Sequence, residues 1–121
     1  MILLGLDASV YKVKKEDSIS DTYFEWKQQE DIAYWRKHGS LNQYMLGLYY
    51  MKGGALPEGE FSVRLTLDDL HKLKHDIIKW NLPYGYDLMG RKDCIIADLQ
   101  MCKDAKRAIA DGYEVYYSAD W

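Results

Sequence analysis

The pattern of hydrophobic and polar positions predicts short strands at both ends of the chain and in its middle. Apolar and polar residues alternate over 4–14, 60–65 and 114–117, which is typical of half-buried strands. A polar turn over 15–21 separates the first strand from a return strand predicted over 22–27. We expect these strands to form a mostly antiparallel sheet.

A helix is predicted over 30–50, where apolar residues recur at helical spacing. One face of this helix carries Tyr34, Leu41, Met45 and Leu48. A second apolar face includes Trp35, so we expect burial on two sides. Gly39 and Ser40 are the weak point, because glycine in a helix costs about 1 kcal/mol relative to alanine. A kink or break is expected there.

Two more helices are predicted over 67–81 and 93–111. Thr66 is the expected N-cap of the first, with Asp69 completing an acidic capping box. Its apolar stripe consists of Leu70, Leu73, Ile77 and Trp80. Asp93 is the expected N-cap of the last helix, and Gly112 is suited to end that helix in a left-handed conformation. Its stripe consists of Ile95, Leu99, Cys102, Ala105 and Ile109.

These elements predict a small α+β protein. The 121 residues, taken as 1–121, are the size of one globular domain. We expect a mostly antiparallel sheet of three to four short strands with three main helices packed on one face. A hydrophobic content of 48% and only 2 prolines exclude disorder and low-complexity sequence.

The net charge and the cysteines limit the possible binding partners and the cellular compartment. The net charge of −3 provides no general basic surface, so a nucleic-acid partner is not expected. The apolar run 2–6 is too short to span a membrane, and we expect a cytoplasmic protein. Cys94 and Cys102 fall in one predicted helix, about 12 Å apart, which is too far for a disulfide. Two buried thiols in a reducing compartment are expected.

The sequence carries no strong catalytic or metal-binding motif. His71 and His75 have the four-residue spacing of helical metal ligands, with Asp68 beside them. Their helix face lies opposite the apolar stripe, so we interpret it as a solvated surface and expect no metal. The glycines of 85–90 fit neither a dinucleotide-binding nor a P-loop spacing, and no cofactor is expected.

The densest cluster of functional side chains lies in the first half of the predicted helix 30–50. It consists of Tyr34, Trp35, Arg36, Lys37 and His38. An arginine beside aromatic residues can hold a carboxylate or phosphate, and such residues are frequent in binding hot spots. Alternatively, Trp35 belongs to the core and Arg36 neutralises an acid such as Asp7. Asp7 follows an apolar strand and is itself a candidate, although such a position is more often a turn cap.

Tyrosine and tryptophan are unusually frequent, with 11 Tyr and 4 Trp against 2 Phe. Tyr34, Trp35 and Trp80 are expected in the core. The expected surface tyrosines are Tyr49, Tyr50, Tyr84, Tyr86, Tyr113 and Tyr116. This division predicts a tyrosine-lined binding surface near Gly53–Gly54 and 84–90, with Tyr84 and Tyr86 as binding residues.

Short motifs along nearly the whole chain resemble a group of small phage and prophage proteins. The motifs are Gly5-Leu6-Asp7, Ala33-Tyr34-Trp35-Arg36-Lys37 and Tyr116-Tyr117 with Trp121. The chain departs from the group at Gly39, where an asparagine is usual, and at Asn42, where a histidine is usual. It also lacks the aromatic run expected after Gly85. The resemblance implies no defined biochemical activity, and the departures weaken an enzymatic interpretation.

These observations favour an accessory protein of a phage or prophage that binds a host protein in the bacterial cytoplasm, with inhibition of a defence system as its specific form. The expected binding residues are Asp7, Tyr34, Trp35, Arg36, His38, Tyr84 and Tyr86. One alternative is a homo-oligomeric assembly protein whose aromatic residues form the interface. Another is a small enzyme or nucleotide-binding protein with Asp7, Arg36 and His38 near one cleft; no catalytic residue is assigned.

Overall fold

The computed structural model describes residues 5–79, 82 and 91–121, except the side chain of Arg91. Four strands form one antiparallel sheet in the order β4–β1–β6–β5. Their bounds are β1 (Asp7–Val13), β4 (Glu30–Arg36), β5 (Glu60–Arg64) and β6 (Glu114–Asp120). A 3-10 turn, η1 (Lys15–Asp17), leads into a separate hairpin, β2 (Ser18–Ser20) and β3 (Tyr23–Phe24). The strand predicted over 22–27 is thus reduced to two residues.

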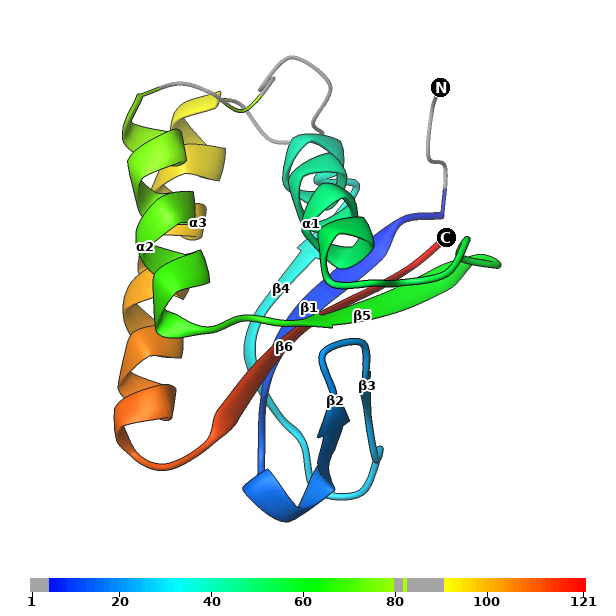
Figure 1. The fold of residues 1–121 in the computed structure, drawn as a ribbon. Coiled ribbons are helices and arrows are strands. Elements are labelled where there is room, and N and C mark those ends of the chain that lie inside the picture. The colour runs from blue at the N-terminus through cyan, green and yellow to red at the C-terminus, as the bar shows by residue number, and fades with distance from the viewer. Residues whose placement is uncertain (1–4, 80–81, 83–90) are drawn as a thin grey trace.

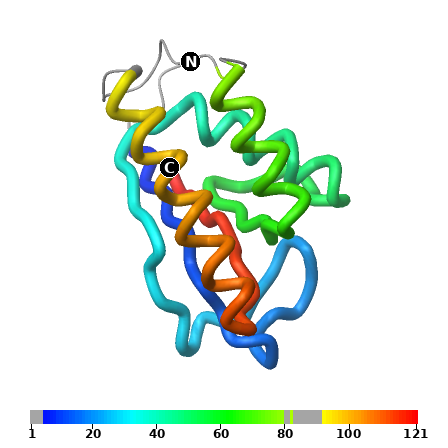
Figure 2. The backbone as a smooth tube through the Cα atoms, turned by 90° about the vertical axis from the view of Figure 1, so that its left-hand side faces the viewer, coloured from blue at the N-terminus to red at the C-terminus, as the bar shows by residue number. Residues whose placement is uncertain are grey.

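Helices lie on one side of the four-stranded sheet and the hairpin lies on the other (Figure 1). The helices are α1 (Gly39–Met51), α2 (Leu67–Ile78) and α3 (Arg91–Ala110). Figure 2 shows α3 running along β1 and β6, with α2 beside it. The predicted fold class, α+β with helices packed on a small antiparallel sheet, is confirmed.

The helix prediction is wrong for residues 30–36, which form β4 instead. Trp35 lies opposite Ala8 and is 4% exposed, whereas Tyr34 faces the other way and is 60% exposed. This alternation is the two-residue period of a strand. Tyr34 was therefore wrongly expected in the core. Lys37 has a φ of 57°, in the left-handed region, and α1 begins two residues later, so the predicted break is the helix start.

The helix boundaries follow local capping chemistry. The Thr66 hydroxyl accepts from the Asp69 amide, and the Asp69 carboxylate accepts from the Thr66 amide, which confirms the capping box. Asp93 was wrongly expected to be an N-cap: α3 begins at Arg91, and Asp93 lies in its first turn. Gly112 has a φ of 96°, as predicted for the residue that ends α3.

Both edges of the sheet carry an irregularity. Across β1 and β4 the register is Val10 to Ala33 and then Tyr11 to Asp31, so Ile32 is an extra, bulged residue. At the other edge, the backbone amide of Arg64 on β5 donates to the carbonyl of Asp21. The Arg64 guanidinium also donates to Asp21 Oδ1 at 2.6 Å. The segment before β3 is thereby fixed to the end of β5.

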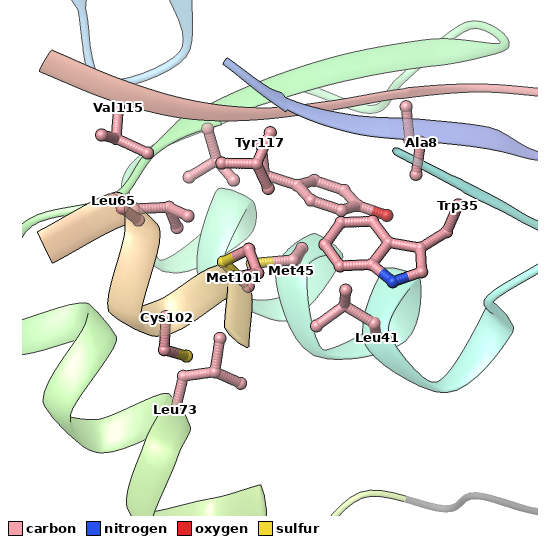
Figure 3. Packing of buried hydrophobic residues seen from close by; sticks show 14 of the residues in the cluster. Ala8, Trp35, Leu41, Met45, Leu65, Leu73, Met101, Cys102, Val115 and Tyr117 are labelled. Atoms are coloured by element: carbon pink, nitrogen blue, oxygen red, sulfur yellow. The ribbon is translucent and has the colours of Figure 1, made fainter. Parts of the chain in front are cut away.

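The main core fills the space between the sheet and the helices (Figure 3). Strands contribute alternate residues and helices contribute stripes, as their periods require. The residues labelled in Figure 3 are Ala8, Trp35, Leu41, Met45, Leu65, Leu73, Met101, Cys102, Val115 and Tyr117. Leu70, Leu73 and Ile77 of the predicted α2 stripe are fully buried. Trp80, the fourth member, lies outside the described residues.

A second, smaller core joins the hairpin to the opposite face of the sheet. It consists of Val13, Phe24 and Tyr116, with Tyr11 packed beside them. The Tyr116 hydroxyl donates to the Ser20 carbonyl and lies 2.7 Å from Ser18 Oγ. Tyr116 was wrongly expected on the surface, because the hairpin covers it.

Several tyrosine side chains pack inside while their hydroxyl groups bind a partner. Tyr117 donates to Asn42 Oδ1, Tyr49 donates to the Ala55 carbonyl, and Tyr44 donates to Asp76. A buried tyrosine satisfies its hydroxyl in this way, which phenylalanine cannot do. Tyr49 was wrongly expected on the surface, and the frequency of tyrosine is partly explained by packing.

Candidate functional site

One end of the sheet presents a face that neither the helices nor the hairpin covers (Figure 1). We call this surface the open face. It consists of Asp7, Ser9, Tyr34, Arg36, Glu60, Ser62, Ser118 and Asp120. The strands place these side chains on one side because they occupy alternate positions in register. Two hydrogen bonds between strands agree with this placement: Tyr34 to Asp7, and Ser62 to Ser118.

The outer part of the open face is a row of four charged residues. Cα register pairs Arg36 with Asp7, Asp7 with Asp120, and Asp120 with Glu60. All four are exposed. The row therefore contains three carboxylates on adjacent strands and one guanidinium at its end. We call it the charged row.

The next row inward is polar and small. It runs from Tyr34 through Ser9 and Ser118 to Ser62. Ser62 Oγ donates to Ser118 Oγ at 3.0 Å. Three of these four side chains are serines; Ser62 and Ser118 are half-buried and Ser9 is buried.

Tyr34 lies at the β4 end of the serine row, next to the charged row. Its hydroxyl donates to Asp7 Oδ1 at 2.6 Å. That hydrogen bond, with lesser contributions from burial and the Asp7 charge, raises the pKa of Tyr34 above its ordinary 10.0. The ring is held by a carboxylate but remains largely exposed, as a residue prepared for contact with a partner would be.

Tyr11 of β1 and Trp26, which follows the hairpin, extend the open face along β1. Tyr11 lies two residues beyond Ser9, on the same side of the strand. The Trp26 ring packs edge-on against Tyr11 at 5.3 Å between centroids and against Phe24 at 4.5 Å. Trp26 is nevertheless 52% exposed. The uncovered surface thus combines aromatic, serine and carboxylate groups.

The cluster 34–38 that the sequence singled out is divided between two sides of the sheet. Tyr34 and Arg36 lie on the open face, opposite or diagonal to Asp7. Trp35 and His38 lie inside, with their rings 5.7 Å apart. The second interpretation is right about Trp35, which is a core residue, and Arg36 is the strand neighbour of Asp7. The binding role of the cluster stays a prediction. Tyr84 and Tyr86 lie outside the described residues.

His38 belongs to a buried polar cluster. Its Nε2 lies 2.8 Å from Asp98 Oδ1, and its Nδ1 lies 3.4 Å from Ser40 Oγ. All three residues are at most 1% exposed. Serine, histidine and aspartate together have the composition of a hydrolase triad, but this burial favours a structural role. The enzymatic alternative placed Asp7, Arg36 and His38 near one cleft. The structure has Asp7 and Arg36 on the open face and His38 inside, on the other side of the sheet.

Sequence reasoning missed Asp120, Glu60 and Asp98. The strand predicted over 114–117 stopped before Asp120, although the alternation of Tyr116 and Ser118 continues to it. The strand order places Glu60 beside Asp120, and the sequence alone does not give that order. Asp98 lies within the apolar turns of α3 and gave no signal as a partner of His38.

The residues considered as metal ligands or as reactive thiols lie outside the open face. His71 and His75 are exposed. Within the described residues, no three side chains of histidine, cysteine, aspartate or glutamate converge as metal ligands. Cys94 and Cys102 are buried thiols, as predicted. Burial, with a lesser effect of the Asp98 charge, raises the pKa of Cys102 to about 11. A protonated thiol is a poor nucleophile.

A shallow pocket of about 290 Å³ lies where β4, β1 and the end of α3 meet. Its lining is Lys12, Glu30, Asp31, Ile32, Asp104, Arg107, Ala108 and Asp111. Lys12 binds Glu30 at 3.1 Å, so part of this charge is already neutralised. The mixed signs do not define a ligand.

Comparison with protein-family models, with curated proteins and with solved structures gave no match. The resemblance to phage and prophage proteins therefore stays a prediction from the sequence. Among the described helices, none combines the length and apolar character needed to cross a membrane.

Proposed function

We propose that the open face is a docking surface for another protein and that this chain is an accessory protein of a phage or prophage that binds a host protein. The observation that carries the proposal is the exposure of Tyr34, at 60%, beside Asp7 and Arg36 on an uncovered sheet face. Tyrosine, tryptophan and arginine are the residue types that contribute most to protein interfaces. The phage origin, the bacterial cytoplasm and the inhibition of a defence system rest on the resemblance of the sequence motifs.

The test is capture of a partner from the bacterial host, followed by reconstitution with the purified partner. Tagged wild-type protein is expected to retain one protein in stoichiometric amount. Tyr34→Ala is expected to weaken the reconstituted complex by about tenfold or more, since hot-spot residues contribute at least 1–2 kcal/mol. Tyr50→Ala is the matched control, because Tyr50 is also an exposed aromatic residue but lies on α1.

Two results would contradict the proposal. One is that no protein is retained specifically under native conditions. The other is that Tyr50→Ala weakens the complex as much as Tyr34→Ala, which would place the contact elsewhere. Light scattering of the purified protein separates the homo-oligomer alternative: a stable oligomer disrupted by Tyr34→Ala would assign the open face to self-association.

A further inference from the structure

The charged row breaks a rule of sheet stability. Like charges directly opposite each other on neighbouring strands are destabilising. Here Asp120 lies between Asp7 and Glu60, with a carboxylate on each side. Neighbouring strands are about 4.8 Å apart, so these groups repel one another across the surface. Places where a chain violates such a local rule are often functional sites.

The described residues place little positive charge beside this row. Arg36 stands opposite Asp7 at one end of the row. In the part of the chain that the structure describes, no lysine or arginine lies within ion-pair distance of Asp120 or Glu60. The three carboxylates also do not converge on one point as metal ligands do. A line of separated carboxylates suits several separate cationic side chains better than one ion.

Building on the function proposed above, we infer that the open face receives a positively charged, arginine- or lysine-bearing segment of the partner protein. Asp7, Asp120 and Glu60 form its charge-assisted contacts, which arginine makes most strongly. Tyr34 stands beside them and offers a ring on which a guanidinium can stack. The hydroxyl groups of the half-buried Ser62 and Ser118 lie next to the charged row as further polar partners.

The first experiment uses a defined probe: a short synthetic peptide that alternates arginine and serine. Nuclear magnetic resonance of the isotope-labelled protein is expected to show amide shifts centred on Asp7, Asp120 and Glu60. Affinity is expected to fall as salt rises, because charge pairs at an exposed surface are screened. A matched peptide with glutamate in place of arginine is expected to cause no shifts.

Variants test the carboxylates directly. The triple substitution Asp7→Asn, Glu60→Gln and Asp120→Asn is expected to weaken binding of the arginine peptide by about tenfold or more. The control makes the same change in net charge elsewhere, with Glu16→Gln, Asp68→Asn and Asp93→Asn, and is expected to change affinity by less than about twofold. These three control residues are exposed and lie outside the open face.

A stability measurement adds a readout that a structural role would not give. Asp120→Asn removes the central charge, so it is expected to raise the Tm of the free protein while weakening peptide binding. A residue with a purely structural role would lower Tm when changed. The inference is overturned if the control triple weakens binding equally, if shifts centre on Asp104 and Asp111, or if the peptide does not bind.

Failure of this inference can be told apart from failure of the proposed function. If the host partner binds the triple variant as well as wild type but loses binding with Tyr34→Ala, the open face is a docking surface and the basic segment is wrong. If no host partner is retained by any form of the protein, the proposed function itself is wrong.

Discussion

The hydroxyl of Tyr34 on β4 donates a 2.6 Å hydrogen bond to Asp7 Oδ1 on β1. This contact joins an exposed aromatic ring to the charged row, and it fixes the side chain without burying it. The ring is thus held in position in the free protein, which would lower the entropy cost of binding in the proposed complex.

The pKa of Tyr34 is expected to fall toward its ordinary value of 10.0 in Asp7→Asn, because the hydrogen bond to the carboxylate is the largest cause of its increase. A raised tyrosine pKa means that the protonated hydroxyl is favoured in the folded state. The bond therefore stabilises the fold below the unfolded pKa and is lost as pH rises through the folded pKa. Titration of the assigned Tyr34 resonance measures the shift. An unchanged titration, or the same change in Asp68→Asn, would contradict this cause.

Asp98→Ala is expected to destabilise the protein by about 1–3 kcal/mol, because it removes a buried hydrogen-bond partner of His38. His38 lies 2.8 Å from Asp98, and both side chains are shielded from solvent. Urea unfolding measures the change. Asp68→Ala is the control, since Asp68 is exposed, and is expected to change the free energy of unfolding far less. A loss below about 1 kcal/mol would mean that the pair contributes little.

Gly54→Ala is expected to destabilise the fold by about 1–3 kcal/mol through overpacking. A Cβ at this position would lie 2.3–2.5 Å from atoms of the Tyr49 ring. That ring is held by its hydroxyl bond to Ala55 and packs against Phe61, so it has little room to move. Thermal unfolding measures the effect.

Gly47→Ala is the matched control for this glycine. Gly47 lies within α1, and its added Cβ meets nothing within 4 Å. The control is expected to stabilise the helix by about 0.5–1 kcal/mol, because glycine is a poor helix former. If both variants shift Tm in the same direction, the contact with Tyr49 is not what restricts Gly54.

Cys102 is expected to react very slowly with iodoacetamide at pH 8. Burial raises its pKa from 9.0 to about 11, so little thiolate is present, and the thiol is shielded from solvent. A raised thiol pKa stabilises the fold below pH 9.0, and this contribution is lost as pH rises from 9.0 through about 11. Mass spectrometry of the alkylated peptide follows the reaction, with the urea-unfolded chain as the fast reference. Equal rates in the two states would contradict the burial of this thiol.

The elements with strong local signals were predictable from the sequence. Thr66 and Asp69 define the start of α2 through a capping box that needs no tertiary information. The apolar stripe of Leu70, Leu73 and Ile77 identifies the buried face of the same helix. Gly112 marks the end of α3, because a φ of 96° is easily adopted only by glycine.

The error at 30–36 has a physical origin. Tyr34, Leu41 and Met45 are spaced as on one helix, but a chain reversal at Lys37 separates the first from the others. The strand is at an edge, so its outward residues are polar or aromatic and its alternation is weak. Pairing with β1, a contact distant in sequence, selects the strand over the helix.

The candidate site was predictable only in part. Asp7, Tyr34 and Arg36 were singled out from the sequence, and the register of β1 and β4 brings them together on one face. Asp120 and Glu60 could not be added without the strand order, since β5 and β6 are separated by α2 and α3 in the chain.

The irregular edges of the sheet limit how copies of this protein can associate. The bulge at Ile32 interrupts the hydrogen-bonding line of β4, and Asp21 occupies the amide of Arg64 on β5. A neighbouring chain therefore meets a broken template at either edge, and the sheet resists extension into the continuous ladders of fibrils. Both features disfavour growth strand by strand in a concentrated solution, so we expect contacts between copies to be made through side chains.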